Sequence, residues 1–237
     1  MKTLIHIIPT LQNGGAETVL SRLVEEFSVS GVMQYVITLQ GATNDFHYSE
    51  ITKYAKVLDW KTDPSLVDQT ILKNSDAPML AWMYSAILFS HKLKRRLKTQ
   101  NPITWNIRHS SFRWNQLYQK AALFGFAVWS HLKDPKIIYC SYSSKEVHEK
   151  YFFSKKNRTV IQNRLAKKMM SLSSEFLSEE KPFLLYVGRY DPSKGPDRLI
   201  KIAQEFFKNK KSYSLTIAGS GWEDAMIPQD LKGKVLL

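Results

Sequence analysis

Short apolar runs recur along this chain, and segments of helical length separate them. A strand that is followed by a helix and then by another strand in the same sheet needs a crossover, which makes neighbouring strands parallel and places helices on both faces. The alternation therefore predicts an α/β fold built from Rossmann-like units. We expect strands at residues 4–8, 34–39, 56–60, 79–83, 103–107, 136–140, 159–161, 183–187, 214–218 and 235–237.

The length and composition allow one large domain or two small ones. The chain has 237 residues, of which 43% are hydrophobic, enough to bury a sizeable core. A stretch rich in Ser, Lys and Glu at residues 164–182 has the composition of a linker. We expect a complete N-terminal Rossmann-like domain at residues 1–163, a hinge at 164–182 and the first part of a second Rossmann-like domain at 183–237.

Two features favour a cytoplasmic protein. No run of about 20 apolar residues occurs, and the N-terminus lacks the pattern of a cleavable signal. Cys140 is the single cysteine, so it cannot form an internal disulfide, which fits a reducing compartment.

The segment at residues 183–195, FLLYVGRYDPSKG, has the layout of a phosphate site. An apolar strand runs into a glycine turn that carries Arg189 and Lys194, and a helix is expected to begin just after Gly195. Backbone N–H groups and the positive end of the helix dipole then point at one place, where an anion is stabilised. Two permanent cations at that place indicate a diphosphate ligand. The pattern is equally consistent with an ordinary strand-to-helix loop whose cations are solvated.

Gly14 and Gly15 follow the first expected strand and precede a helix at residues 16–27. Their lack of a Cβ atom would let a phosphate or a sugar approach the backbone. A plain tight turn also requires glycine, so both interpretations stay open. We expect Glu17, in the first helical turn, to interact favourably with the helix dipole.

Positive charge is concentrated in one region. The formal net charge is +13, and residues 77–133 contain no Asp or Glu but nine Lys or Arg. Aromatic residues such as Trp105, Phe126 and Trp129 are interspersed among these cations. Such a surface suits an anionic membrane or a pyrophosphate-linked lipid, and less well a nucleic acid, for which the chain shows no known motif. The alternative is that the aromatic residues form core and the cations are a solvated face.

Three segments together resemble a known family. The stretch GRYDPSKGPDRLIKIAQEF, from Gly188, resembles the opening of the nucleotide-sugar domain of retaining glycosyltransferases of family 4, which have the GT-B architecture. SLTIAGSGWED, which contains Gly219 and Gly221, resembles the second strand and glycine turn of that domain. IHIIPTLQNGGAETVLSRL resembles the first strand and glycine loop of the N-terminal domain. The three segments occur in the order in which the family has them.

The resemblance implies a function and a set of residues. Arg189 and Lys194 match the positions of the G-R-x(4)-K pattern that contact the donor diphosphate, and the glycine turns would adjoin the same donor. In WNIRHSS, at residues 105–111, Arg108 would bind a donor or acceptor phosphate, and His109 would hydrogen-bond the sugar. A lone histidine is also common as an ordinary surface or core residue. The implied enzyme is a retaining hexosyltransferase that needs neither a metal nor a cofactor.

The implied partners are a nucleotide-sugar donor and a polysaccharide or lipid-linked acceptor in cell-surface glycan synthesis. We expect no nucleic-acid partner, and we expect a cytoplasmic location that extends to the inner face of the plasma membrane. The family pattern continues with an E-x(7)-E motif that does not occur after Lys194, and the turn at Ile161 to Arg164 lacks the glycine of the family. We therefore expect a C-terminally truncated member. The alternative is an inactive fragment that binds a membrane or a partner through its basic N-terminal domain.

Overall fold

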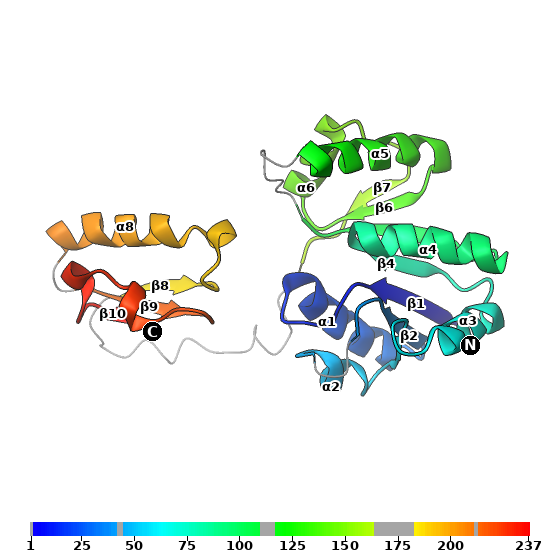
Figure 1. Ribbon diagram of the computed structural model, residues 1–237, viewed down its shortest axis with the longest axis horizontal. Coiled ribbons are helices and arrows are strands. Elements are labelled where there is room, and N and C mark those ends of the chain that lie inside the picture. Colours follow the sequence, from blue (N-terminus) through cyan, green and yellow to red (C-terminus); the bar gives the residue numbers. More distant parts are fainter. Residues whose placement is uncertain (1, 42–44, 110–116, 164–182, 211–212) are drawn as a thin grey trace. The chain divides into compact units, whose positions relative to one another are not determined.

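Two parallel sheets organise the chain (Figure 1). The computed structural model describes residues 2–41, 45–109, 117–163, 183–210 and 213–237. The chain divides into two compact units, Met1–Met170 and Ser171–Leu237, which we call unit 1 and unit 2. The expected hinge at 164–182 lies outside the described residues.

Unit 1 contains a seven-stranded sheet with the order β3-β2-β1-β4-β5-β6-β7. All neighbouring strands are parallel, and the strand order reverses beside β1, where ligands of such sheets bind. The strands are β1 Thr3–Ile8, β2 Met33–Thr38, β3 Lys56–Asp59, β4 Met79–Trp82, β5 Ile103–Ile107, β6 Lys136–Tyr139 and β7 Arg158–Val160. The helices are α1 Gly15–Val29, α2 Tyr48–Ile51, α3 Pro64–Lys73, α4 Met83–Leu97, α5 Leu117–Lys133 and α6 Tyr142–Lys150.

Helices cover both faces of this sheet. Because successive side chains of a strand point to opposite faces, Ile5 and Ile7 of β1 belong to one cluster and Ile8 to the other. The first cluster includes buried residues of α3, α4 and α5, and the second includes buried residues of α1 and α2. The central strands are therefore buried on both sides, which is typical of parallel sheets.

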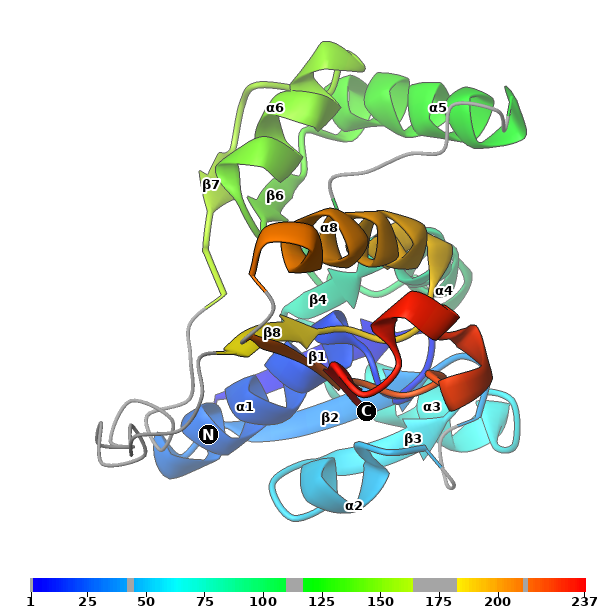
Figure 2. The ribbon, with the colours of Figure 1, turned by 90° about the vertical axis from the view of Figure 1, so that its left-hand side faces the viewer.

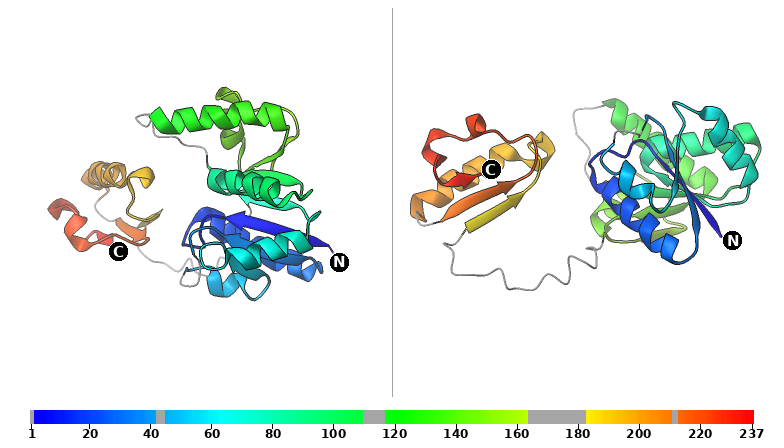
Figure 3. Two further views of the ribbon diagram at one scale, coloured as in Figure 1. Left: turned by 45° about the vertical axis from the view of Figure 1, so that its right-hand side comes forward. Right: turned by 90° about the horizontal axis from the view of Figure 1, so that it is seen from below.

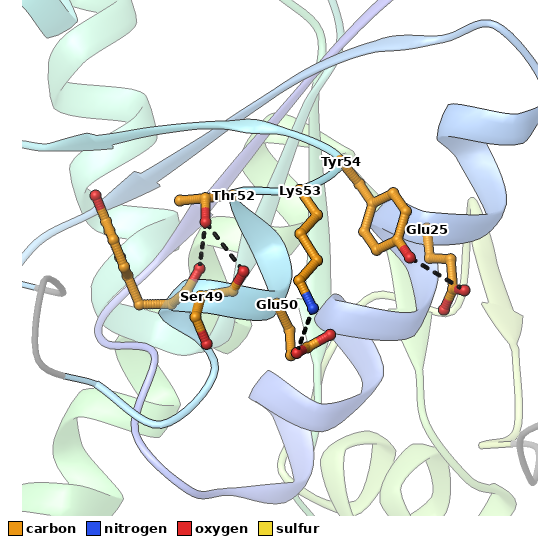
Figure 4. A network of polar contacts seen from close by, with 7 residues as sticks. Glu25, Ser49, Glu50, Thr52, Lys53 and Tyr54 are labelled. Carbon is orange, nitrogen blue, oxygen red and sulfur yellow. Dashed lines mark hydrogen bonds and ion pairs between the residues drawn. The ribbon is translucent and has the colours of Figure 1, made fainter.

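The short helix α2 is joined to its surroundings by surface contacts (Figure 4). Lys53 Nζ donates to Glu50 Oε1 at 2.7 Å, and Thr52 Oγ1 donates to the carbonyls of the preceding turn. Tyr54 Oη donates to Glu25 Oε1 of α1 at 3.5 Å. Exposed contacts of this kind contribute little to the free energy of unfolding, so the buried residues hold α2 in place.

Unit 2 contains a three-stranded parallel sheet with the order β10-β9-β8 (Figure 3). Its strands are β8 Phe183–Val187, β9 Ser214–Ala218 and β10 Val235–Leu236, and the α-helix among its described residues is α8 Pro196–Asn209. Ala203 and Phe207 of α8 pack on Leu215 and Ile217 of β9. This cluster covers one face of the sheet.

These sheets confirm the predicted parallel α/β fold. Several expected strands differ from the observed ones by a residue at an end, and Met83, which we expected to end a strand, begins α4. In the basic stretch, Trp105 and Phe126 are buried, whereas Phe124 is exposed. The core interpretation therefore holds for two of these aromatic side chains. Residues 110–116, which include Phe112 and Trp114, lie outside the described residues.

Candidate functional site

The turn after β8 brings Arg189 and Lys194 into one short segment. A 3-10 helix, Pro192–Lys194, follows Arg189, and α8 begins with Pro196 at its first position. Gly195 caps α8 in the left-handed conformation, with φ 69°, which a glycine adopts without strain. The Lys194 N–H donates to the Asp191 carbonyl at 2.8 Å, and Tyr186 Oη donates to the Lys194 carbonyl at 3.2 Å. The backbone that carries Lys194 is therefore fixed from two sides.

A cavity of about 250 Å³ opens where α8 begins. Lys194 and Arg198 supply its charges, and Tyr186 and Ile202 contribute to its walls. An ideal Cβ on Gly195 would lie 3.5 Å from Arg198 Cδ, so the Arg198 side chain folds back along the helix toward its amino end. The positive end of the helix dipole adds to the two cations here.

Three cations and two carboxylates, those of Asp191 and Asp197, lie in this segment. Among the residues that the structure describes, Arg189, Lys194 and Arg198 form no ion pair. All three residues are exposed. Exposed cations that form no ion pair are a suitable environment for an anion with several oxygens.

We did not predict Arg198 as a site residue from the sequence. It lies four residues after Lys194 in the first turn of α8, a spacing that places both side chains near the start of the helix. Arg198 could have been predicted as a site residue from this spacing.

The glycines of unit 2 hold two loops together. An ideal Cβ on Gly219 would lie 2.1 Å from the Gly188 carbonyl oxygen, so only glycine fits there. The Tyr190 N–H donates to the Ser220 carbonyl at 2.9 Å, and Trp222 Nε1 donates to the Gly188 carbonyl at 2.9 Å. The loop after β9 thus supports the turn that carries Arg189.

Gly188 and Gly221 differ from Gly219 in what their missing Cβ atom would meet. At Gly188 it would meet the hydroxyl of Tyr186 at 2.9 Å, and at Gly221, where φ is 81°, it would lie 3.5 Å from Tyr190 Cβ. The structure explains Gly219 and Gly221 by packing and backbone conformation, without a ligand.

Arg108 lies just after β5, at the carboxyl edge of the sheet of unit 1. Its guanidinium carbon lies 5.4 Å from the ring centre of Trp82, at the end of the neighbouring strand β4. Its Nη2 donates to Asn163 Oδ1, from the segment after β7. Burial lowers the pKa of Arg108, but a guanidinium stays charged in proteins. Stacking and the hydrogen bond therefore hold one cation in a defined orientation.

His109 lies in an aromatic cluster beside Arg108. Its ring meets the edge of Tyr84 at 5.3 Å and that of His148 at 5.8 Å, measured between ring centres. Its carbonyl accepts a hydrogen bond from Ser144 Oγ at 2.7 Å. Burial lowers the pKa of His109, which favours a neutral imidazole.

The tautomer of His148 follows from its two partners. Nδ1 lies 2.6 Å from the Ser144 carbonyl, which can only accept, so Nδ1 carries the proton. Nε2 then accepts from Tyr84 Oη at 2.6 Å. Burial lowers the pKa of His148 to about 4, so the imidazole is neutral near pH 7. Tyr84 and His148 form a fixed wall for His109, and neither was singled out from the sequence, since they lie on separate helices.

The side chain of Glu17 occupies part of the glycine loop after β1. An ideal Cβ on Gly14 would lie 2.3 Å from Glu17 Oε2, so this carboxylate folds back over the start of α1. A glutamate in this position interacts favourably with the free amides and the dipole of the helix. Next to Gly15 there is open space within 4 Å. An anion at Gly14 would have to displace or approach a negative charge, so Gly15 is the more accessible of the two.

The predicted site residues thus form three groups. Arg189, Lys194 and the glycines of unit 2 share the turn after β8, Arg108 and His109 share the end of β5, and Gly14 and Gly15 lie at the end of β1. Within the described ranges, no group of three His, Cys, Asp or Glu is arranged to hold a metal ion. No described helix is both long enough and apolar enough to cross a membrane.

Comparisons with known proteins support the class of fold. Residues 171–232 match the family model of glycosyl transferases group 1, and no curated protein matches the chain. The solved structures that the chain resembles include Anabaena Alr3699/HepE in complex with UDP-glucose, with 12% identity and a TM-score of 0.73. That likeness covers 100% of this chain and 68% of HepE.

Two further structures have the same fold. The lipopolysaccharide outer core galactosyltransferase WaaB is 15% identical, with a TM-score of 0.64, and the likeness covers 100% of this chain and 67% of WaaB. TarM is 11% identical, with a TM-score of 0.65, and the likeness covers 100% of this chain and 76% of TarM. The fold is therefore that of GT-B glycosyltransferases, and the family match covers most of unit 2.

Proposed function

We propose that this chain transfers a hexose from a nucleotide-sugar donor to a polysaccharide or lipid-linked acceptor in cell-surface glycan synthesis. The family match in unit 2 and the fold of both units support the transferase class. WaaB acts on lipopolysaccharide according to its name, which supports the acceptor class. The alternative, an inactive membrane-binding fragment, predicts that nucleotides do not bind.

The exposed cations after β8, which form no ion pair among the described residues, carry this proposal. When the bond between the anomeric carbon and the diphosphate breaks, the electron pair leaves with the nucleoside diphosphate, whose negative charge increases. Arg189 supplies a planar pair of donors for two oxygens, and Lys194 supplies a compact charge. Cations fixed at that place stabilise the leaving group more in the transition state than in the ground state.

Arg198 extends the same group along the cavity. Because its side chain folds back toward the start of α8, it lines the cavity together with Lys194. These three cations would neutralise a diphosphate by themselves, which supports a reaction without a metal. The acceptor hydroxyl then forms the new bond to the anomeric carbon with retention of configuration, and its proton passes to the leaving diphosphate or to solvent.

Unit 1 would contribute Arg108 and His109 to substrate binding. Trp82 and Asn163 hold Arg108, so it would bind a phosphate with little loss of side-chain entropy. A neutral His109 can hydrogen-bond a sugar hydroxyl both as donor and as acceptor. Gly15 leaves room for a ligand at the end of β1.

Titration of the protein with UDP tests the proposal, with ADP and GDP in parallel because all three share the diphosphate. We expect Lys194→Ala and Arg189→Ala each to weaken binding about tenfold or more, since each removes a charge-assisted contact. Lys201→Ala is the matched control, because Lys201 is an exposed lysine of α8 that forms no ion pair among the described residues. Equal affinity in all three variants would remove the turn from the donor site, and no binding by the wild type would favour the inactive fragment.

A further inference from the structure

Three buried side chains that can hydrogen-bond lie on adjacent strands of unit 1, and we call Gln34 of β2, His6 of β1 and Trp82 of β4 the buried polar row. Trp82 belongs to the cluster that includes α1, and so do Ile8 and Val36, each two residues after His6 or Gln34 in its strand. The row therefore faces α1, which lies alongside β1 and β2 (Figure 2). Buried polar groups are costly unless they are hydrogen-bonded.

Each hydrogen bond in the row has a defined direction. An indole nitrogen can only donate, so Trp82 Nε1 donates to His6 Nδ1 at 3.4 Å. Burial lowers the pKa of His6 to about 4, so the ring is neutral near pH 7 and its single proton is on Nε2. Nε2 then donates to Gln34 Oε1 at 3.2 Å, and Gln34 Nε2 donates to the Val24 carbonyl of α1 at 2.7 Å. The edge of the indole is thus connected to the backbone of α1.

The face of the same indole meets Arg108. The guanidinium carbon lies 5.4 Å from the ring centre of Trp82, and Nη2 donates to Asn163 Oδ1. A hydrogen bond at the edge of a ring limits its rotation, and the direction of its face determines the plane of a guanidinium stacked on it. The orientation of Arg108 therefore depends on His6 and Gln34, although no item of contact joins them to Arg108 directly.

Stability alone does not account for the row. Apolar side chains of similar shape at the positions of His6 and Gln34 would fill the same space, and replacing both partners of a buried hydrogen bond in this way is nearly neutral. A fully hydrogen-bonded buried network instead selects one arrangement of its side chains. The arrangement selected here is that of the indole on which Arg108 is stacked.

We propose that His6 and Gln34 are positioning residues, which act through Trp82 to fix the guanidinium plane of Arg108 for phosphate binding. The inference rests on the proposed function, in which Arg108 binds a phosphate of the donor or the acceptor. Trp82 covers one face of the guanidinium and Asn163 accepts from one nitrogen, so the other N–H groups can bind two oxygens of one phosphate. Because the plane is fixed before the phosphate arrives, binding restricts fewer side-chain rotations.

NMR spectroscopy of the isotope-labelled full chain tests the positioning without a ligand. The Nε–Hε signal of Arg108 is assigned by its disappearance in Arg108→Lys. The ring current of Trp82 should displace this signal from the usual position of arginine signals, because the guanidinium lies over the indole. We expect His6→Leu to move the signal toward the usual position, and Gln34→Leu to do so to a smaller extent. An unchanged signal in both variants would overturn the proposal.

Trp105 and His91 provide a matched control. Trp105 Nε1 donates to His91 Nε2 at 3.0 Å, and Trp105 is fully buried, as Trp82 is. Trp105 belongs to the cluster on the opposite face of the sheet. His91→Leu therefore removes the same kind of acceptor from the same kind of donor outside the buried polar row. We expect it to lower the melting temperature about as much as His6→Leu and to leave the Arg108 signal unchanged. Equal displacement in both variants would indicate a general loosening of unit 1 and would overturn the proposal.

Titration with inorganic pyrophosphate, followed at the Arg108 signal, tests the consequence for binding. We expect His6→Leu to weaken this binding about threefold to tenfold and His91→Leu to change it less than about twofold. In a Trp82→Phe background, which lacks the indole N–H, His6→Leu should have little further effect. A full effect of His6→Leu in that background would mean that His6 does not act through the indole, which would overturn the proposal.

Failure of this proposal and failure of the proposed function give different results. The function is decided by UDP binding and its dependence on Lys194, which lies in unit 2, whereas the row lies in unit 1. If pyrophosphate does not move the Arg108 signal of the wild type, this proposal is overturned even where UDP binds. If UDP does not bind but pyrophosphate moves the Arg108 signal, and more weakly so in His6→Leu, the positioning role holds and the proposed function does not.

Discussion

The sheets of the two units are covered differently. In unit 1 helices bury both faces, so Ile7 and Ile8 of β1 are both inaccessible although they point in opposite directions. Among the described residues of unit 2 one face of the sheet is covered, and β8 alternates between partly buried and exposed side chains. Phe183, Leu185 and Val187 are exposed by 52%, 60% and 73%. The apolar composition of β8 is that of a strand buried on both sides, and its surroundings in unit 2 satisfy one side.

The difference extends to chemistry. Unit 1 contains all six histidines and the buried polar clusters, and unit 2 contains no histidine. In the described part of unit 2, exposed cations without an ion pair lie on a turn that the loop after β9 supports. The buried polar residues of unit 1 thus form hydrogen bonds within the unit, whereas the exposed cations of unit 2 are placed to bind an anion. Three predictions test this contrast.

The largest expected effect is a loss of stability of unit 1 in mild acid. Burial lowers the pKa of His6 and of His148 from 6.5 to about 4. Below pH 6.5 the unfolded chain binds protons that the folded unit does not bind, so stability falls as the pH decreases toward 4. Between pH 7 and about pH 5 each imidazole should cost about 2 kcal/mol.

Hydrogen exchange measured by mass spectrometry resolves the two units in this experiment. Amides of β1 and β4 should lose protection at about pH 5 when exchange is corrected for its intrinsic pH dependence, whereas β9 should change little. His6→Asn should reduce the pH dependence of unit 1 if it folds, and His131→Asn, at an exposed position, serves as the control. Equal loss of protection in both units would show that histidine burial is not the cause.

The next effect concerns glycines in the turns. Gly219→Ala should destabilise unit 2 by roughly 1–3 kcal/mol, because its Cβ would meet the Gly188 carbonyl at 2.1 Å and push the two loops apart. We expect the Gly219→Ala variant also to bind UDP more weakly. Gly15→Ala, in the first turn of α1 with open space around it, should stabilise unit 1 slightly, by about 0.5 kcal/mol. Denaturant unfolding measures the free energy of unfolding of both variants. An unchanged value for Gly219→Ala would mean that the close contact between the two loops does not contribute to stability.

The sequence predicted the fold better than it predicted the site. The apolar runs of the strands and the glycine turns are local signals, so the parallel sheets could be predicted. Contacts between distant elements leave no local signal. One example is the hydrogen bond between Tyr84 and His148, which are 64 residues apart. Another is the hydrogen bond from Arg108 to Asn163, which are 55 residues apart.

Gly14 shows the same limit at short range. The sequence left both a phosphate loop and a tight turn open, and the position of the Glu17 side chain favours the second interpretation. Exposure is a further property that composition does not reveal. Phe124 and Phe126 have the same side chain two residues apart, yet one is exposed and the other is buried, because a helix turns them to different sides.

The smallest expected effect is at the uncovered face of β8. Leu185→Thr should change the free energy of unfolding by less than about 0.5 kcal/mol, because the leucine is 60% exposed and threonine is well tolerated in strands. The same change should reduce self-association, measured by analytical ultracentrifugation, since an exposed apolar strand at a sheet edge promotes pairing between chains. Thr216→Val, at the half-buried neighbouring position of β9, is the opposite change and should increase association. A loss of about 2 kcal/mol or more in Leu185→Thr would instead mean that this face is covered in solution, and the contrast between the two sheets would disappear.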